Sequence, residues 1–87
     1  SNQMRSILRN EGESVLNNAK KIGEDNGLVI QTRLLEGTPS EEIVKFTNKN
    51  DLIVMGSKGK SKLKQVFIGS VSENVLHHAD CDVMIVR

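Results

Sequence analysis

The sequence has few aromatic residues, with two phenylalanines and no tryptophan or tyrosine among 87 residues. A core built from this chain must therefore be aliphatic. The one cysteine, Cys81, excludes an internal disulfide framework and fits a reducing compartment. No apolar run approaches the ~20 residues needed to cross a bilayer, and no secretory signal pattern opens the chain. We therefore expect a cytoplasmic protein with no membrane partner.

An excess of one charge is also lacking, because 12 basic residues are balanced by 11 acidic ones, giving a net charge of +1. This balance argues neither for a nucleic-acid partner nor for a membrane surface. A chain of this length is near the lower limit for a self-sufficient core. We expect residues 1–87 to form a single domain.

The spacing of apolar residues predicts three helices alternating with three strands. The predicted helices cover residues 3–24, 38–50 and 70–79, and the predicted strands cover residues 28–35, 52–55 and 83–86. Gly27 is a stop signal after the first helix. This alternation favours an α/β fold with a parallel sheet and right-handed crossovers.

Two helix starts resemble capping boxes, in which a hydroxyl and a carboxylate satisfy the first free amides. Thr38 is the expected N-cap of one helix, followed by Pro39 at the first helical position and Glu41 two residues later. Ser70 and Glu73 form the second candidate pair.

Glycines punctuate the connection between the strand at 52–55 and the helix that follows it. Gly56 and Gly59 come directly after the strand, and Gly69 precedes Ser70 at the expected helix start. Glycine lets backbone N–H groups approach an anion, and a helix N-terminus supplies unpaired donors and a positive dipole end. The order of strand, glycine loop and helix predicts a phosphate-binding site. The alternative is a loop whose glycines serve only as turns, with Ser70 merely capping the helix.

The spacing Gly56-x2-Gly59-x9-Gly69-Ser70 resembles the nucleotide-binding motif of the universal stress protein family, in its ATP-binding branch. The segments 37–43, 51–56, 69–75 and 81–86 resemble, in order, a helix start, a strand, a helix start and the last strand of that family. The resemblance implies a three-layer α/β/α fold with a parallel sheet. It also implies that this chain is truncated to three strands and three helices, without the family's first strand, first helix and second strand.

The resemblance further implies a stress-response regulator that binds ATP, with Mg²⁺ held mostly through the phosphates. Met55 and Gly56 would lie near the base or ribose. The residues expected to hold the phosphates are Gly59, Gly69, Ser70 and Val71. The family's adenine-contacting aspartate belongs to the missing first strand. Its absence leaves open whether these 87 residues bind nucleotide alone.

A homodimer or a swapped assembly is also expected, because three strands alone would leave apolar edges exposed. The resemblance makes the last strand, Val83 to Arg87, the candidate interface. Replacing Ile85 with lysine would then weaken the dimer.

Binding of ATP is expected to order the loop from Ser57 to Ile68, giving a ligand-dependent switch. The alternative is an interaction module that binds no nucleotide and uses the basic loop residues Lys58, Lys60, Lys62 and Lys64. Bulk at Gly69 would distinguish the two, because it would block nucleotide without touching a contact made by lysines. A weaker option is a phosphotransferase or hydrolase half-site completed by the missing segment.

The remaining candidates for chemistry are weak. Gly59-Lys60-Ser61 resembles the end of a Walker A loop, but Val54 stands where that motif needs glycine. His77 and His78 are adjacent on a helix and point about 100° apart, which argues against joint metal ligation. Gln65 is the one candidate for positioning water, so slow ATP hydrolysis stays open while a dedicated enzyme is not supported.

Overall fold

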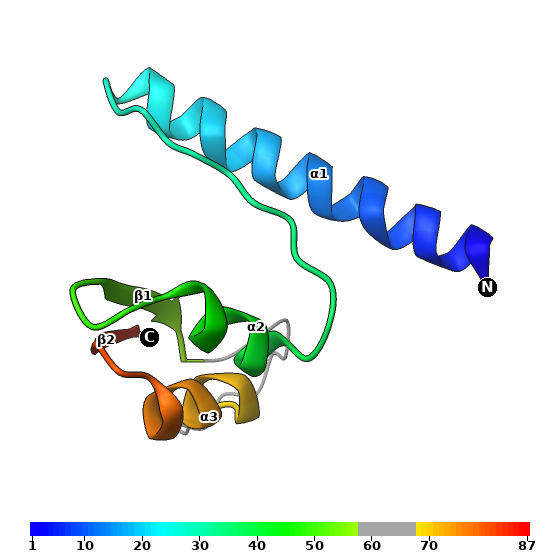
Figure 1. The fold of residues 1–87 in the computed structure, drawn as a ribbon. Helices are drawn as coiled ribbons and strands as arrows, with labels where there is room; N and C mark the ends of the chain where they lie inside the picture. Colours follow the sequence, from blue (N-terminus) through cyan, green and yellow to red (C-terminus); the bar gives the residue numbers. More distant parts are fainter. Residues whose placement is uncertain (58–67) are drawn as a thin grey trace. The chain divides into compact units, whose positions relative to one another are not determined.

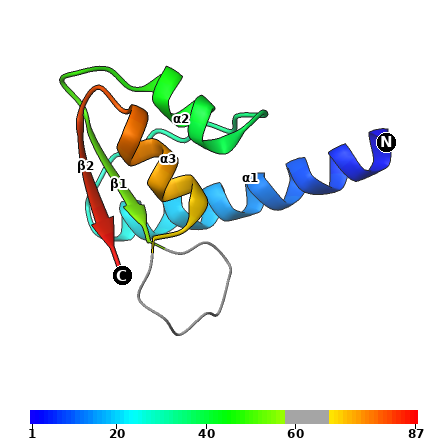
Figure 2. The same cartoon turned by 90° about the horizontal axis from the view of Figure 1, so that it is seen from below.

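The computed structural model describes residues 1–57 and 68–87 of the chain. Within them the elements follow in the order helix, helix, strand, helix, strand (Figures 1 and 2). Their bounds are α1 (Asn2–Asp25), α2 (Pro39–Phe46), β1 (Leu52–Gly56), α3 (Ser70–His78) and β2 (Asp82–Val86). The chain forms two compact units, Ser1–Leu35 and Glu36–Arg87. No helix in the described residues is long and apolar enough to cross a membrane.

The first unit is built on α1, which confirms the helix predicted over residues 3–24. Its end is a glycine turn, in which Gly27 has a φ of 76°. The amides of Gly27 and Leu28 donate to the carbonyls of Glu24 and Gly23, at 3.0 and 2.9 Å. This Schellman arrangement satisfies carbonyls that the helix itself leaves unpaired, so Gly27 is the predicted stop.

The apolar stripe of α1 lies largely exposed within its own unit. Five of its large side chains keep between 54% and 65% of their surface exposed: Met4, Ile7, Leu8, Val15 and Ile22. The only buried residue of the helix is Gly23. Local hydrogen bonds, rather than a core of its own, therefore stabilise α1 within this unit.

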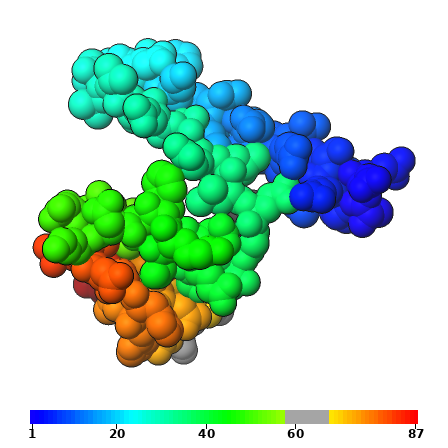
Figure 3. Space-filling model, viewed as in Figure 1, coloured from blue at the N-terminus to red at the C-terminus, as the bar shows by residue number. Residues whose placement is uncertain are grey.

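The strand predicted over residues 28–35 is wrong. This segment runs back along α1 without forming a strand (Figures 1 and 3). It places side chains over glycines of the helix. A Cβ on Gly12 would lie 2.7 Å from Leu34 Cδ1, and a Cβ on Gly23 would overlap Ile30 Cδ1. β-branched residues favour extended backbone, but a strand also needs a neighbour for its N–H and C=O groups. In the described residues the sheet consists of β1 and β2.

The second unit contains this sheet, in which β1 and β2 run parallel with Ile53 opposite Val83. Figure 2 shows the two strands side by side and pointing the same way. The strands predicted at 52–55 and 83–86 are thereby confirmed. The fold of the described residues is a small α/β fold with a parallel sheet of two strands, because the segment at 28–35 does not join it.

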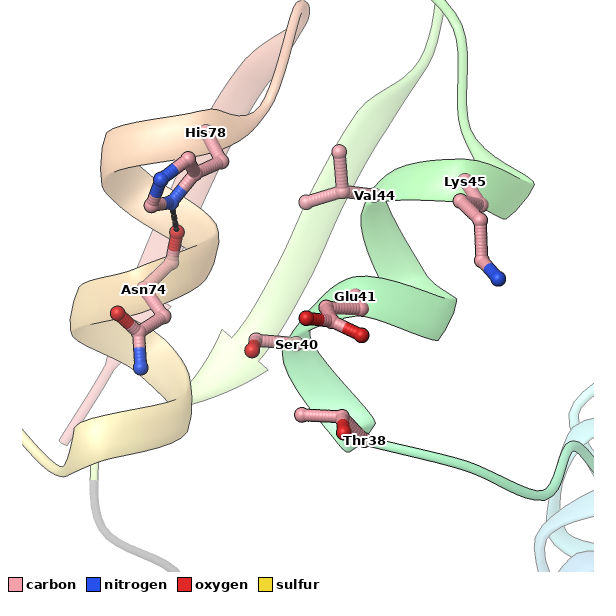
Figure 4. Close-up of a pocket in the computed structure, with 7 residues that line it drawn as sticks. All are labelled: Thr38, Ser40, Glu41, Val44, Lys45, Asn74 and His78. Atoms are coloured by element: carbon pink, nitrogen blue, oxygen red, sulfur yellow. Dashed lines mark hydrogen bonds between the residues drawn. The ribbon is translucent and has the colours of Figure 1, made fainter.

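The core of this unit lies on one face of the sheet. Ile53 of β1 is 7% exposed and Val75 of α3 is fully buried. Helices α2 and α3 contact each other, and Figure 4 views them with both strands behind. On the other face of the sheet, four large hydrophobic residues are each 50% to 57% exposed: Leu52, Val54, Met84 and Val86. Within this unit one helical layer is therefore present, and the three-layer arrangement stays a prediction.

Helix α2 is shorter than predicted, because it ends at Phe46 and not near Asn50. Thr47 leaves the helical conformation with a ψ of 161°. Its amide and its hydroxyl both donate to the carbonyl of Ile43, at 3.2 and 3.1 Å. A side chain that returns to the preceding turn thus replaces the next helical hydrogen bond.

The start of α2 also differs from its prediction. Thr38 is the N-cap and Pro39 opens the helix, as expected, but the Thr38 side chain makes no capping hydrogen bond. The capping box predicted with Glu41 is therefore absent. The fixed φ of proline and the acidic first turn, Glu41 and Glu42, stabilise this helix start instead.

Candidate functional site

The candidate site lies where β1 ends and α3 begins, and hydrogen bonds join this end of β1 to β2 and to the start of α3. The Ser57 amide donates to the Val86 carbonyl at 2.9 Å, which extends the parallel ladder beyond Gly56. The Gly69 amide donates to the Ser57 carbonyl at 2.6 Å. The Ser72 hydroxyl donates to the Gly56 carbonyl, also at 2.6 Å. These bonds fix the carboxyl end of β1 against the N-terminus of α3.

The N-terminus of α3 presents backbone donors without intrahelical acceptors. Its first helical hydrogen bond runs from the Glu73 amide to the Gly69 carbonyl, at 2.9 Å. The amides of Ser70, Val71 and Ser72 precede that bond, so the helix offers them no carbonyl. With the dipole of the helix behind them, such amides favour a bound anion.

The predicted cap of α3 is wrong by one residue. Gly69, and not Ser70, is the N-cap, and Ser70 is the first helical residue. Glu73 consequently stands one position too late for a capping box, and no side chain caps this helix. The carbonyl of Gly69 accepts the first helical hydrogen bond, from Glu73, and its amide is held by a long-range bond to the Ser57 carbonyl.

The predicted site residues fall into three groups. Met55 is half-buried in β1 and Gly56 is exposed at its end, while Gly69 and Val71 are half-buried and Ser70 is exposed at the start of α3. The structure therefore brings five of them to one junction. The sixth, Gly59, lies outside the described residues, as do the four loop lysines and Gln65.

The Gly69 amide cannot serve as a free donor here, because it is already bonded to the Ser57 carbonyl. The contribution of Gly69 to this site is its missing side chain, which adds no bulk beside the neighbouring amides.

Sequence reasoning missed Ser57 and Ser72, which are 5% and 4% exposed. Both are polar residues buried at the junction, and both make hydrogen bonds to the other element. The bond from Ser72 to Gly56 spans 16 residues of sequence. No local pattern in the chain predicts such a contact.

The histidines of α3 make contacts within their own helix. His78 Nδ1 lies 2.8 Å from the Asn74 carbonyl oxygen, and His77 Nε2 lies 3.9 Å from a carboxylate oxygen of Glu73. Across residues 1–57 and 68–87, no three His, Cys, Asp or Glu side chains are grouped to hold a metal ion. Cys81 is a half-buried free thiol just before β2.

A separate open cavity of about 470 Å³ lies between α2 and α3 (Figure 4). Its lining residues are Thr38, Ser40, Glu41, Val44, Lys45, Asn74 and His78. None of them belongs to the glycine junction. Lys45 is paired with Glu42 at 3.1 Å, and the Nδ1 of His78 faces its own helix (Figure 4). Two of the polar side chains around this cavity, those of Lys45 and His78, thus make contacts within their own helices.

Comparison with known proteins identifies the family of the chain. Residues 2–87 match the Universal stress protein family. Universal stress protein MJ0531 of Methanocaldococcus jannaschii is 45% identical over 83 residues, covering 93% of this chain and 49% of that protein. MJ0577 of the same organism is 38% identical, covering 99% and 54%. YxiE of Bacillus subtilis is 37% identical, covering 98% and 59%.

No solved structure matches the chain significantly. The chain spans about half the length of the curated relatives that it matches. With a family match over nearly every residue, the chain belongs to the universal stress protein family.

Proposed function

We propose that this chain forms the phosphate-binding half of an ATP site in a stress-response regulator. The observation that carries the proposal is the junction of β1 and α3. There, the amides of Ser70, Val71 and Ser72 have no intrahelical acceptor beside a side-chain-free Gly69. Backbone donors at a helix N-terminus bind phosphate through partial charge and hydrogen bonds, without a dedicated basic residue.

We propose an adenine nucleotide as the ligand, rather than a simple anion, because the spacing of Gly56, Gly59 and Gly69 resembles a nucleotide-binding motif. By the resemblance of this motif to the ATP-binding branch, Met55 and Gly56 would lie near the base or ribose. The adenine contacts themselves are expected in a segment preceding these residues. Mg²⁺ would be held by phosphates and water, as is usual for this ion.

Binding is proposed to act as a switch at the loop from Ser57 to Ile68. Residues 58–67 lie outside the described residues, while Ser57 is hydrogen-bonded to Gly69 at the start of α3. A partner that binds the loop with different affinity in the presence and absence of ATP would respond to nucleotide binding. Amide hydrogen exchange across the loop should slow with saturating Mg·ATP, and unchanged exchange would contradict the switch.

A calorimetric titration of Mg·ATP tests the proposed function. It should be run on this chain and on the protein with an upstream half restored. Saturable one-to-one binding to either would support the nucleotide site, and binding to the longer form alone would assign the adenine contacts to the added half. If neither folded protein binds, the interaction module that uses the loop lysines becomes the better hypothesis.

We further propose that β2 pairs with a second copy of the chain. In the described sheet β2 has one strand neighbour, β1, so its other edge is open. Ile85 lies on the half-buried face, so a lysine there would also perturb the core. Met84, which is 51% exposed, is the cleaner probe. Met84→Lys should shift sedimentation from dimer to monomer, and an unchanged profile would exclude this interface.

A further inference from the structure

Ser72 is buried although it lies in the first turn of a helix, where serine usually faces water. It is 4% exposed, and its hydroxyl donates to the carbonyl of Gly56 at 2.6 Å. Serines inside helices often bond back to a carbonyl of their own helix. Here the hydroxyl instead reaches across to the last residue of β1.

This hydrogen bond matters for an anion because of the carbonyls nearby. The carbonyls of Gly56 and Ser57 are the last two before the chain leaves the end of β1, and each carries a partial negative charge. Both have a donor: Gly56 takes the Ser72 hydroxyl, and Ser57 takes the Gly69 amide. Among the described residues, these two acceptors are thus engaged, while α3 offers no intrahelical acceptor to the amides of Ser70, Val71 and Ser72, an arrangement that favours an anion.

We propose that Ser72 is a positioning residue for the phosphates, which acts by holding the Gly56 carbonyl away from the ligand. The proposal rests on the proposed nucleotide site. Without the hydroxyl, the Gly56 carbonyl loses its donor and is free to turn its oxygen toward the phosphates. The loss should weaken binding of the triphosphate more than binding of the nucleoside, because adenosine carries no phosphate.

The test compares dissociation constants for Mg·ATP and for adenosine by calorimetry, in the form of the protein that binds ATP. Ser72→Ala should weaken ATP binding roughly 3- to 10-fold, the equivalent of one hydrogen bond. Its adenosine affinity should stay within about twofold of the parent. Ser72→Thr, which keeps the hydroxyl, should restore ATP binding. Ser40→Ala, the same change at a half-buried serine early in α2, should alter neither constant.

The possible outcomes separate the two proposals. If the parent binds ATP and Ser72→Ala binds it equally well, the role of Ser72 is wrong and the nucleotide site stands. If ATP and adenosine weaken together, Ser72 is only structural. If the folded parent does not bind ATP, the nucleotide site itself is wrong. Should Ser72→Ala fail to fold, Ser72→Cys keeps a weaker donor of similar size and should lower ATP affinity selectively.

Discussion

The N-termini of α2 and α3 carry the same kind of dipole but differ in what surrounds it. Helix α2 begins with Pro39, which lacks an N–H donor, and has two carboxylates in its first turn, Glu41 and Glu42. Helix α3 follows Gly69 and has one acidic residue there, Glu73. The first helix start thus lacks one donor and has two carboxylates to offset its dipole, whereas the second keeps all its backbone donors and has one carboxylate. A helix N-terminus alone therefore does not make an anion site.

The two helices also differ in how firmly they are attached. Helix α3 buries Ser72 and Val75 and is hydrogen-bonded to the end of β1 through two contacts. Helix α2 has no buried residue. The donors of α3 are consequently held at a defined place relative to the sheet, which lowers the cost of organising a ligand site.

The largest expected effect comes from filling the space at Gly69. Its φ of −68° and ψ of 164° are accessible to any residue, so Gly69→Val should fold. The added side chain would lie beside the amides of Ser70, Val71 and Ser72 and should cost about 3 kcal/mol or more in ATP binding, the value of two charge-assisted hydrogen bonds. Thr38→Val, at the matching position of α2, should leave ATP affinity unchanged. An equal loss of ATP affinity in both variants would show that the N-termini of α2 and α3 do not differ in their role in ATP binding.

The next largest effect is expected on the free energy of unfolding, when a packed valine is shortened in each helix. Val75 is fully buried in α3, while Val44 of α2 is half-buried. Val75→Ala should lower the free energy of unfolding by about 2 kcal/mol in urea titrations, and Val44→Ala by about 1 kcal/mol or less. A larger loss for Val44→Ala would mean that α2, and not α3, anchors the unit.

The smallest effect is expected from a substitution that makes the start of α3 resemble that of α2. Ser70→Asp places a carboxylate in the first turn and should stabilise the fold by about 0.3–1 kcal/mol. The same charge should repel phosphate and weaken ATP binding roughly tenfold. Ser70→Asn is the neutral control, and Glu41→Gln in α2 should cost a few tenths of a kcal/mol without affecting ATP. If ATP affinity rose in Ser70→Asp, the phosphates would lie elsewhere.

Local patterns predicted the elements that local contacts determine. The span of α1 and its stop at Gly27 follow from helical periodicity and from a glycine with positive φ. Both strands of the sheet were recognisable as short apolar runs between turn residues. The segment at 28–35 was misassigned, because its residue types favour extended chain while strand formation depends on a neighbour.

The candidate site was only partly predictable for the same reason. Its glycine spacing is visible in the sequence, and five of the six proposed residues meet at one junction. The helix cap Gly69 is bonded to Ser57, and the buried Ser72 is bonded to Gly56. Both are contacts between distant residues, which no helix-capping rule includes.

The most direct test of the central claim is an amide ¹H–¹⁵N spectrum of the ATP-binding form of the protein during addition of Mg·ATP. The account predicts that the amides of Ser70, Val71 and Ser72 shift saturably, while those of Glu41 and Glu42 at the start of α2 stay in place. Shifts at α2 without shifts at α3 would contradict it.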